Sequence, residues 1–170
     1  MSDAERKRLW LIPSSLFFFI VVPMATIIIG GRIDAAAGLQ AFPRRPLDYA
    51  LGLPLLLAGV WVTLESIRVF LVEGRGVPLG DLVSSEQSTT LITGGIYAHT
   101  RNPMLLGYLV ALLGLGLVSR SVGASLVLPG AYTAIWTAWI KLKEEPALEE
   151  RFGEEYLDYR ERTPFLVPGL

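Results

Sequence analysis

Two short groups of polar residues in this chain have the types and spacing of a binding site. The first group lies in residues 94–107 and contains Arg101-Asn102-Pro103, and the second lies in residues 144–164 and begins with Glu144-Glu145-Pro146. Arginine and asparagine side chains can donate hydrogen bonds to anionic groups, and carboxylates accept them from cationic groups. The two groups can therefore form one polar site, provided that the fold brings them together.

The stretch between the two groups, residues 104–142, is almost entirely apolar. A transmembrane helix needs about 20 mainly apolar residues, and four windows approach or exceed that length: 9–29, 47–72, 104–118 and 122–142. The last two form a hairpin that leaves the membrane on the side where it entered, so both polar groups are expected at one membrane face. The mean hydropathy of +0.48 and the 18% charged residues favour a membrane protein. We predict an all-α, polytopic transmembrane bundle of about four spans, with residues 1–170 forming a single domain.

The segments outside the spans carry turn signals and one amphipathic pattern. Residues 30–46, which begin with Gly30-Gly31, are expected to form an outer loop, and Ser119-Arg120-Ser121 a tight turn. The apolar part of the first window exceeds a signal-peptide core of about 7–15 residues, so we interpret it as a retained span. In the tail, 143–170, four apolar residues recur at helical spacing and predict an amphipathic helix that Gly153 bends: Leu148, Phe152, Tyr156 and Tyr159.

Basic residues in the loops predict the orientation. The N-terminal segment, the loop 73–102 and the C-terminal residues from Lys141 onward carry ten lysines and arginines, against four on the opposite side. The N- and C-termini are therefore expected in the cytoplasm, and the protein in the cell inner membrane if the host is bacterial.

The composition also excludes several kinds of site. The chain has no cysteine, so it has neither a disulfide nor a thiolate ligand. The single histidine, His99, cannot alone supply a metal site of ordinary ligand count, and no metal is expected. The net charge of −1 gives no sign of nucleic-acid binding.

Each polar residue also has a purely structural interpretation. Asn102 and Pro103 suit the start of a helix, and Gly107, one turn later, suits close helix packing as well as the approach of a ligand. Glu144 and Glu145 together can be a solvated helix end. Two further candidates lie outside the motifs. Glu65 in the second span is three residues from Arg68 and can pair with it, and His99 can accept a proton near neutral pH.

Taken together, these residues resemble the integral-membrane methyltransferase superfamily, which includes isoprenylcysteine carboxyl methyltransferases and phospholipid N-methyltransferases. Residues 74–78, 91–97 and 101–107 resemble its central motif, and residues 144–164 resemble its C-terminal motif. The resemblance covers roughly residues 74–168. Many relatives have histidine where this chain has Asn102, a departure that the phospholipid branch shares.

The resemblance implies S-adenosylmethionine (SAM) as the methyl donor, held between the two motifs. It implies that the following residues line the cofactor: Tyr97, Arg101, Asn102, Pro103, Leu106, Gly107, and Glu144 or Glu145. A carboxylate at 144 or 145 suits the ammonium group of SAM, and Arg101 and Asn102 suit its carboxylate. Tyr97 or Tyr156 can face the cationic end.

The expected reaction is transfer of the methyl group to a lipophilic or small membrane-accessible acceptor: an isoprenylcysteine-type carboxylate, a phospholipid amine or a thiol. Arg162, Glu65 and His99 are the candidate catalytic residues, the first two on the acceptor side. The sequence leaves the acceptor and the oligomeric state open. Two alternatives are an NADPH-dependent membrane reductase of the sterol-reductase type and a non-catalytic helical bundle.

Overall fold

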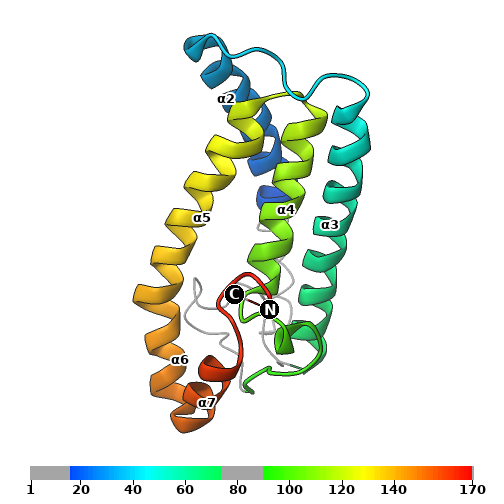
Figure 1. The fold of residues 1–170 in the computed structure, drawn as a ribbon. Coiled ribbons are helices and arrows are strands. Elements are labelled where there is room, and N and C mark those ends of the chain that lie inside the picture. Colours follow the sequence, from blue (N-terminus) through cyan, green and yellow to red (C-terminus); the bar gives the residue numbers. More distant parts are fainter. Residues whose placement is uncertain (1–15, 74–89, 170) are drawn as a thin grey trace, which may run out of the picture. The chain divides into compact units, whose positions relative to one another are not determined.

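The computed structural model describes residues 16–73 and 90–169, and every regular element in these ranges is a helix (Figure 1). Residues 9–15 of the first predicted span and residues 74–78 of the central motif lie outside the described residues. The chain divides into two compact units, Met1–Leu56 with Leu112–Pro129 and Leu57–Ala111 with Gly130–Leu170.

Two helical stretches are long and apolar enough to cross a membrane, Phe17–Ala37 and Leu47–Val72. The first consists of a π-helical turn, η1 (Phe17–Val21), and helix α2 (Val22–Ala37), and the second lies in α3 (Leu47–Glu73). Large apolar side chains on these helices are exposed, such as Ile28 at 54% and Trp61 at 65%, as expected for a surface that faces lipid. A shorter apolar helix, α4 (Pro103–Val118), matches the predicted window 104–118.

The predicted outer loop 30–46 was wrong at its start, because α2 continues through Gly30 and Gly31 to Ala37. Gly30 lies against the π-helical turn η4 (Gly123–Val127), where a Cβ at this position would be 2.6 Å from the Cβ of Ala124. The missing side chain permits close helix packing and does not mark a break. Helix α2 ends instead at Gly38, whose φ of 64° is left-handed. The turn predicted at residues 119–121 is confirmed, with Arg120 at a φ of 56°.

In the second unit, α3 and α4 pack closely through small residues. A Cβ on Gly107 would be 2.7 Å from both the backbone nitrogen and the Oγ1 of Thr63. Gly59 lies against Ala111 in the same way, with a Cβ 2.8 Å from its Cα atom. Thr63 donates its hydroxyl hydrogen to the Gly59 carbonyl at 2.8 Å, so it leaves no unsatisfied polar group at this contact. The geometry at Gly107 is that of helix packing.

Helix α5 (Leu128–Trp139) continues through a π-helical turn, η5 (Ile140–Glu144), into α6 (Glu145–Phe152). Pro146 has no N–H to donate to the carbonyl of Leu142, and the wider π turn just before it accommodates this loss. At Gly153, with φ 55° and ψ −129°, the chain turns into α7 (Glu154–Arg162). The single bent helix expected in the tail is therefore two helices, separated by a backbone conformation that favours glycine.

The α3–α4 contact predicts that the same change, glycine to alanine, affects stability differently at two positions. Gly59→Ala should lower stability by about 1–3 kcal/mol, because the new Cβ overlaps α4. Gly31→Ala adds the same methyl group to α2, where nothing lies within 4 Å, and should leave stability unchanged or raise it by up to about 1 kcal/mol. Thermal unfolding of both variants in detergent measures the difference, and equal melting temperatures would contradict the packing described here.

Candidate functional site

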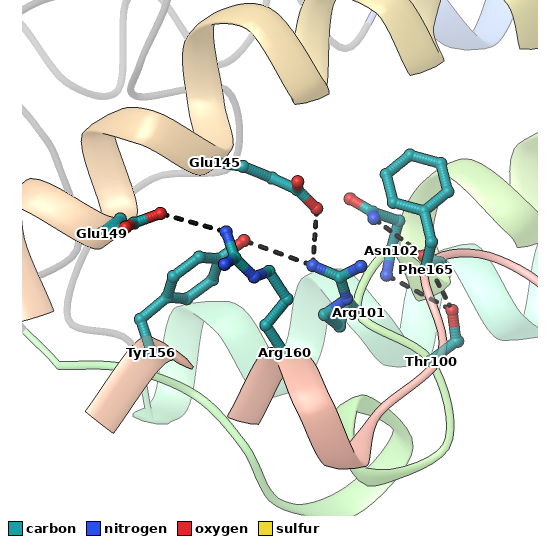
Figure 2. Close-up of polar contacts among 8 residues, drawn as sticks. All are labelled: Thr100, Arg101, Asn102, Glu145, Glu149, Tyr156, Arg160 and Phe165. Carbon is teal, nitrogen blue, oxygen red and sulfur yellow. Dashed lines mark hydrogen bonds and ion pairs between the residues drawn. The ribbon is translucent and has the colours of Figure 1, made fainter. Parts of the chain in front are cut away.

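The centre of the candidate site is an ion pair between the two motifs (Figure 2). The Nη1 atom of Arg101 lies 2.5 Å from Oε1 of Glu145, at the start of α6. The two side chains are only 12% and 13% exposed. Arg101 Nη1 also donates to the hydroxyl oxygen of Tyr156, on α7, at 3.4 Å. The predicted meeting of the two groups is therefore confirmed, through the contact of Arg101 with Glu145.

Residues 100–102 bind three consecutive carbonyls near the C-terminus. Arg101 donates its backbone N–H to the carbonyl of Pro164 at 2.9 Å, and Asn102 donates its side-chain amide to that of Phe165 at 2.8 Å. Thr100 donates its hydroxyl hydrogen to the carbonyl of Leu166 at 2.8 Å. We call this contact between residues 100–102 and 164–166 the clasp; Figure 2 shows its Asn102–Phe165 bond.

The ring of Phe165 adds a second contact to the clasp. The guanidinium carbon of Arg101 lies 5.6 Å from the ring centroid, and Nζ of Lys141 lies 5.2 Å from it. Cations at this range are attracted to an aromatic face. Phe165 therefore contacts Asn102 through its backbone and Arg101 through its side chain.

Two buried tyrosines support the loop that carries the central motif. Tyr97 lies in a 3₁₀ turn, η3 (Gly95–Ala98), and its carbonyl accepts a hydrogen bond from the Tyr159 hydroxyl at 2.8 Å. Burial raises the pKa of Tyr97, and the nearby Tyr159 and the charge of Glu144 raise it further. Burial is also the main cause that raises the pKa of Tyr159. Both hydroxyls therefore stay protonated at neutral pH and serve as hydrogen-bonding groups.

Tyr156, the third tyrosine of this group, is 2% exposed. Its pKa is raised, first by burial and then by the charge of Glu145. Arg160 lies over its ring at 5.9 Å and donates to Glu149 of α6 at 3.0 Å. This outer ion pair, drawn in Figure 2, connects α6 and α7, and both of its side chains are far more exposed than those of Arg101 and Glu145.

The other predicted cofactor residues lie around this centre. Pro103 is fully buried in the first turn of α4, and Leu106 is half-buried on the same helix. Gly107 lies against α3, as described above. Glu144, half-buried in the π turn, lies near enough to Tyr97 for its charge to act on that hydroxyl.

The three predicted catalytic residues have other surroundings. Glu65 accepts two hydrogen bonds from Arg68, at 2.6 and 2.8 Å, as the spacing predicted. Arg162 is exposed and donates to the carbonyl of Asp158 in its own helix at 3.0 Å. His99 is exposed just after η3. Among the described contacts, those of Glu65 and Arg162 are within their own helices and not with the Arg101–Glu145 pair.

Sequence reasoning did not identify Thr100 and Phe165 as site residues. Thr100 is only 2% exposed, although it lies in a loop, and Phe165 follows Pro164 beyond the end of α7. The sequence does contain a signal for Phe165, because an aromatic residue directly after the helix-ending Thr163-Pro164 is unexpected in a solvated tail. Thr100 had no such signal, because its role depends on backbone carbonyls far along the chain.

The helices and the site define an all-helical, membrane-associated protein in which two distant motifs meet at a buried ion pair. The sequence profile of the phospholipid methyltransferase family matches residues 47–155, well over half of the chain. The chain belongs to this family, and the resemblance inferred from its motifs is confirmed. No solved structure matches the chain.

Two kinds of curated relative are similar to this chain. One is the cobalt-zinc-cadmium resistance protein CzcN of Cupriavidus metallidurans, 33% identical over 117 residues, which are 66% of this chain and 53% of that protein. The other is the protein-S-isoprenylcysteine O-methyltransferase of Rattus norvegicus, 30% identical over 131 residues, which are 71% of this chain and 41% of the enzyme. The chain thus spans about half the length of these relatives or less.

The buried tyrosines predict a loss of stability in alkali. The unfolded chain releases tyrosine protons near their ordinary pKa of about 10, whereas the folded protein retains them at Tyr97 and Tyr159. This stabilisation is complete below pH about 10 and is lost as the pH rises further. Thermal unfolding between pH 8 and 11 should show the decrease.

Tyr159→Phe tests the contribution of one of these hydroxyls. The variant should lose about 1–2 kcal/mol at pH 8, because the carbonyl of Tyr97 loses its donor, and its stability should fall less steeply above pH 10. Tyr49→Phe, at a residue that is 45% exposed, is the matched control and should behave like the wild type. An unchanged alkaline slope in Tyr159→Phe would show that this hydroxyl is not protected by the fold.

Proposed function

We propose that this protein transfers a methyl group from SAM to a lipophilic or small membrane-accessible acceptor. Membership of the phospholipid methyltransferase family supports the reaction class. The observation that carries the proposal is the Arg101–Glu145 pair, because it places one cationic and one anionic side chain, both nearly buried, beside the first turn of α4.

The charges of this centre fit the amino-acid part of SAM, which bears an ammonium and a carboxylate. Arg101 has its Nε atom buried without a hydrogen-bond partner among the described residues, so the guanidinium has a donor to spare for a carboxylate. Glu145 is the acceptor for the ammonium. Because a zwitterion supplies both opposite charges, it can pair with Arg101 and Glu145 without leaving either buried charge uncompensated.

Asn102 completes this part of the proposed site. Its amide nitrogen donates to Phe165, and in Figure 2 its amide oxygen points to the side where Glu145 lies. Two acceptor oxygens on the same side favour a cationic group between them. On α6, Leu148 and Phe152 are half-buried and supply apolar surface for the adenine ring.

The bound cofactor supplies a methyl group on a sulfonium, which an acceptor attacks in line. The task of the protein is then to hold the two reactants in that line, which can lower the barrier by roughly 7–11 kcal/mol. Tyrosine is protonated at neutral pH, and burial raises the pKa of the Tyr97 and Tyr156 hydroxyls further, so both can orient neighbouring groups as hydrogen-bond donors. Carboxylate and thiolate acceptors arrive anionic and need no base.

We further propose that the chain crosses the membrane four times, over about 9–29, 47–72, 104–118 and 122–142, with both termini in the cytoplasm. The excess of basic residues in the N-terminal segment, the loop 73–102 and the tail supports this orientation. It gives the cofactor access from the cytoplasm and a lipid acceptor access between the helices. The amphipathic tail, here α6 and α7, then lies at the cytoplasmic face.

Calorimetry with S-adenosylhomocysteine, the demethylated cofactor, tests the cofactor site. The wild type in detergent should bind it, and Glu145→Gln should weaken binding at least about tenfold, since a partner of the ligand ammonium is lost. Glu149→Gln is the matched control: it removes one charge from the same helix, one turn further on, at a carboxylate that is 46% exposed. This control should bind like the wild type.

Three results would contradict the proposal. Failure of the wild type to bind at millimolar ligand would rule out the cofactor, and competition by NADPH would point to a reductase. Equal affinities of the Glu145→Gln and Glu149→Gln variants would reject the site while leaving the reaction class standing. A radiolabelled methyl-transfer assay on lipid extract and small thiols then identifies the acceptor.

The orientation can be tested by labelling single cysteines, because the chain has none of its own. In intact spheroplasts, a membrane-impermeant maleimide should label Leu39→Cys, in the loop after α2. It should label Glu155→Cys, on the exposed side of α7, only after the membrane is permeabilised. The reverse pattern would invert the proposed topology. Labelling of both cysteines in intact spheroplasts would show that the loop after α2 and the tail lie on the same side of the membrane, against the proposal.

A further inference from the structure

The clasp connects residues of the proposed cofactor site to the segment 164–166. Three of its bonds join consecutive residues on both sides, with Thr100, Arg101 and Asn102 as the donors. Two of these donors come from the residues that the proposed function places against the cofactor. The third donor is the hydroxyl of Thr100, a residue that lies just before them and is 2% exposed.

Thr100 connects the clasp to the start of α4 as well. Its hydroxyl oxygen accepts a hydrogen bond from the backbone N–H of Asn102 at 3.3 Å, while its hydrogen is donated to Leu166. One hydroxyl therefore fixes both the backbone of Asn102 and the position of the C-terminal segment. A side chain of the same shape without the hydroxyl would leave the N–H of Asn102 and a carbonyl of the C-terminal segment without this partner.

Phe165 contacts the side chains of both Asn102 and Arg101. Its carbonyl holds the Asn102 amide in one orientation, and its ring lies beside the Arg101 guanidinium. Because Lys141 lies near the same ring, the ring also limits how far either cation can move. The clasp thus determines where the charged and polar atoms of the motif point, although its own atoms are mostly backbone.

We propose that Thr100 and Phe165 are positioning residues, and that the clasp holds Arg101 and Asn102 in the geometry that binds the cofactor. This inference rests on the proposed function for the identity of the ligand. Neither residue was assigned to the site by the sequence motifs. The clasp contributes by ordering the site in advance, so that less conformational freedom is lost when the ligand binds.

The test compares Thr100→Val with Thr100→Ser. Valine keeps the shape and loses the hydroxyl, whereas serine keeps the hydroxyl and loses a methyl group, so both disturb packing or bonding at a buried position. Calorimetry should show S-adenosylhomocysteine binding about tenfold weaker in Thr100→Val and close to the wild-type value in Thr100→Ser. A residue that only stabilises the fold would not give this split, because affinity would then follow the melting temperature of each variant.

Phe165→Leu and Phe165→Tyr form the second pair. Both retain the backbone carbonyl, but only tyrosine retains a ring for Arg101. Phe165→Leu should bind the ligand several-fold more weakly than Phe165→Tyr, since the guanidinium loses its aromatic neighbour. Equal affinities within either pair, or affinities that merely follow thermal stability, would overturn the proposal.

Hydrogen exchange without any ligand separates this inference from the proposed function. The amide hydrogen of Arg101 donates to Pro164, so a peptide covering residues 98–104 should exchange faster in Thr100→Val than in Thr100→Ser or the wild type. If the wild type fails to bind S-adenosylhomocysteine while this exchange pattern holds, the cofactor assignment fails and the clasp stands. Equal exchange in all three proteins overturns the clasp itself.

Discussion

The buried ion pair between Arg101 and Glu145 is the constraint on which the rest of the second unit depends. Two opposite charges, each nearly removed from water, are tolerated only when they lie against each other, and losing one partner leaves the other uncompensated. The chain must therefore bring residue 101 to residue 145. Within the second unit, the close packing of α3 on α4 and the turn at Gly153 accompany this contact.

The family match and the site do not end at the same residue. The phospholipid methyltransferase profile covers Arg101, Asn102 and Glu145 but stops at residue 155. Tyr156, which contacts Arg101, and the C-terminal half of the clasp follow this boundary. The part of the site within the profile carries the charges, and the part beyond it contributes Tyr156 and the carbonyls that residues 100–102 contact.

The features that depend on composition could be predicted from the sequence. The prediction was wrong where one residue type can have two structural roles. The windows 47–72 and 104–118 agree with α3 and α4, because a long apolar run in a lipid environment has few alternatives to a helix. Gly30-Gly31 indicated a loop, yet glycine also permits close helix contact, and only the position of Ala124 distinguishes the two. The clasp was beyond prediction, since backbone carbonyls are the same at every residue.

The position of Glu145 shows a further effect of the π turn at Ile140–Glu144. In that turn the N–H of Glu145 bonds to the carbonyl of Ile140, five residues back, so the turn holds one residue more than an α-helical turn. At 3.6 residues per turn, one additional residue rotates everything that follows by about 100° around the helix axis. The turn therefore acts as a phase shift: its extra residue sets the angular position at which the Glu145 carboxylate leaves the helix. A backbone hydrogen bond to Ile140 thus decides, one turn earlier in the chain, on which side of the helix the negative charge of Glu145 lies.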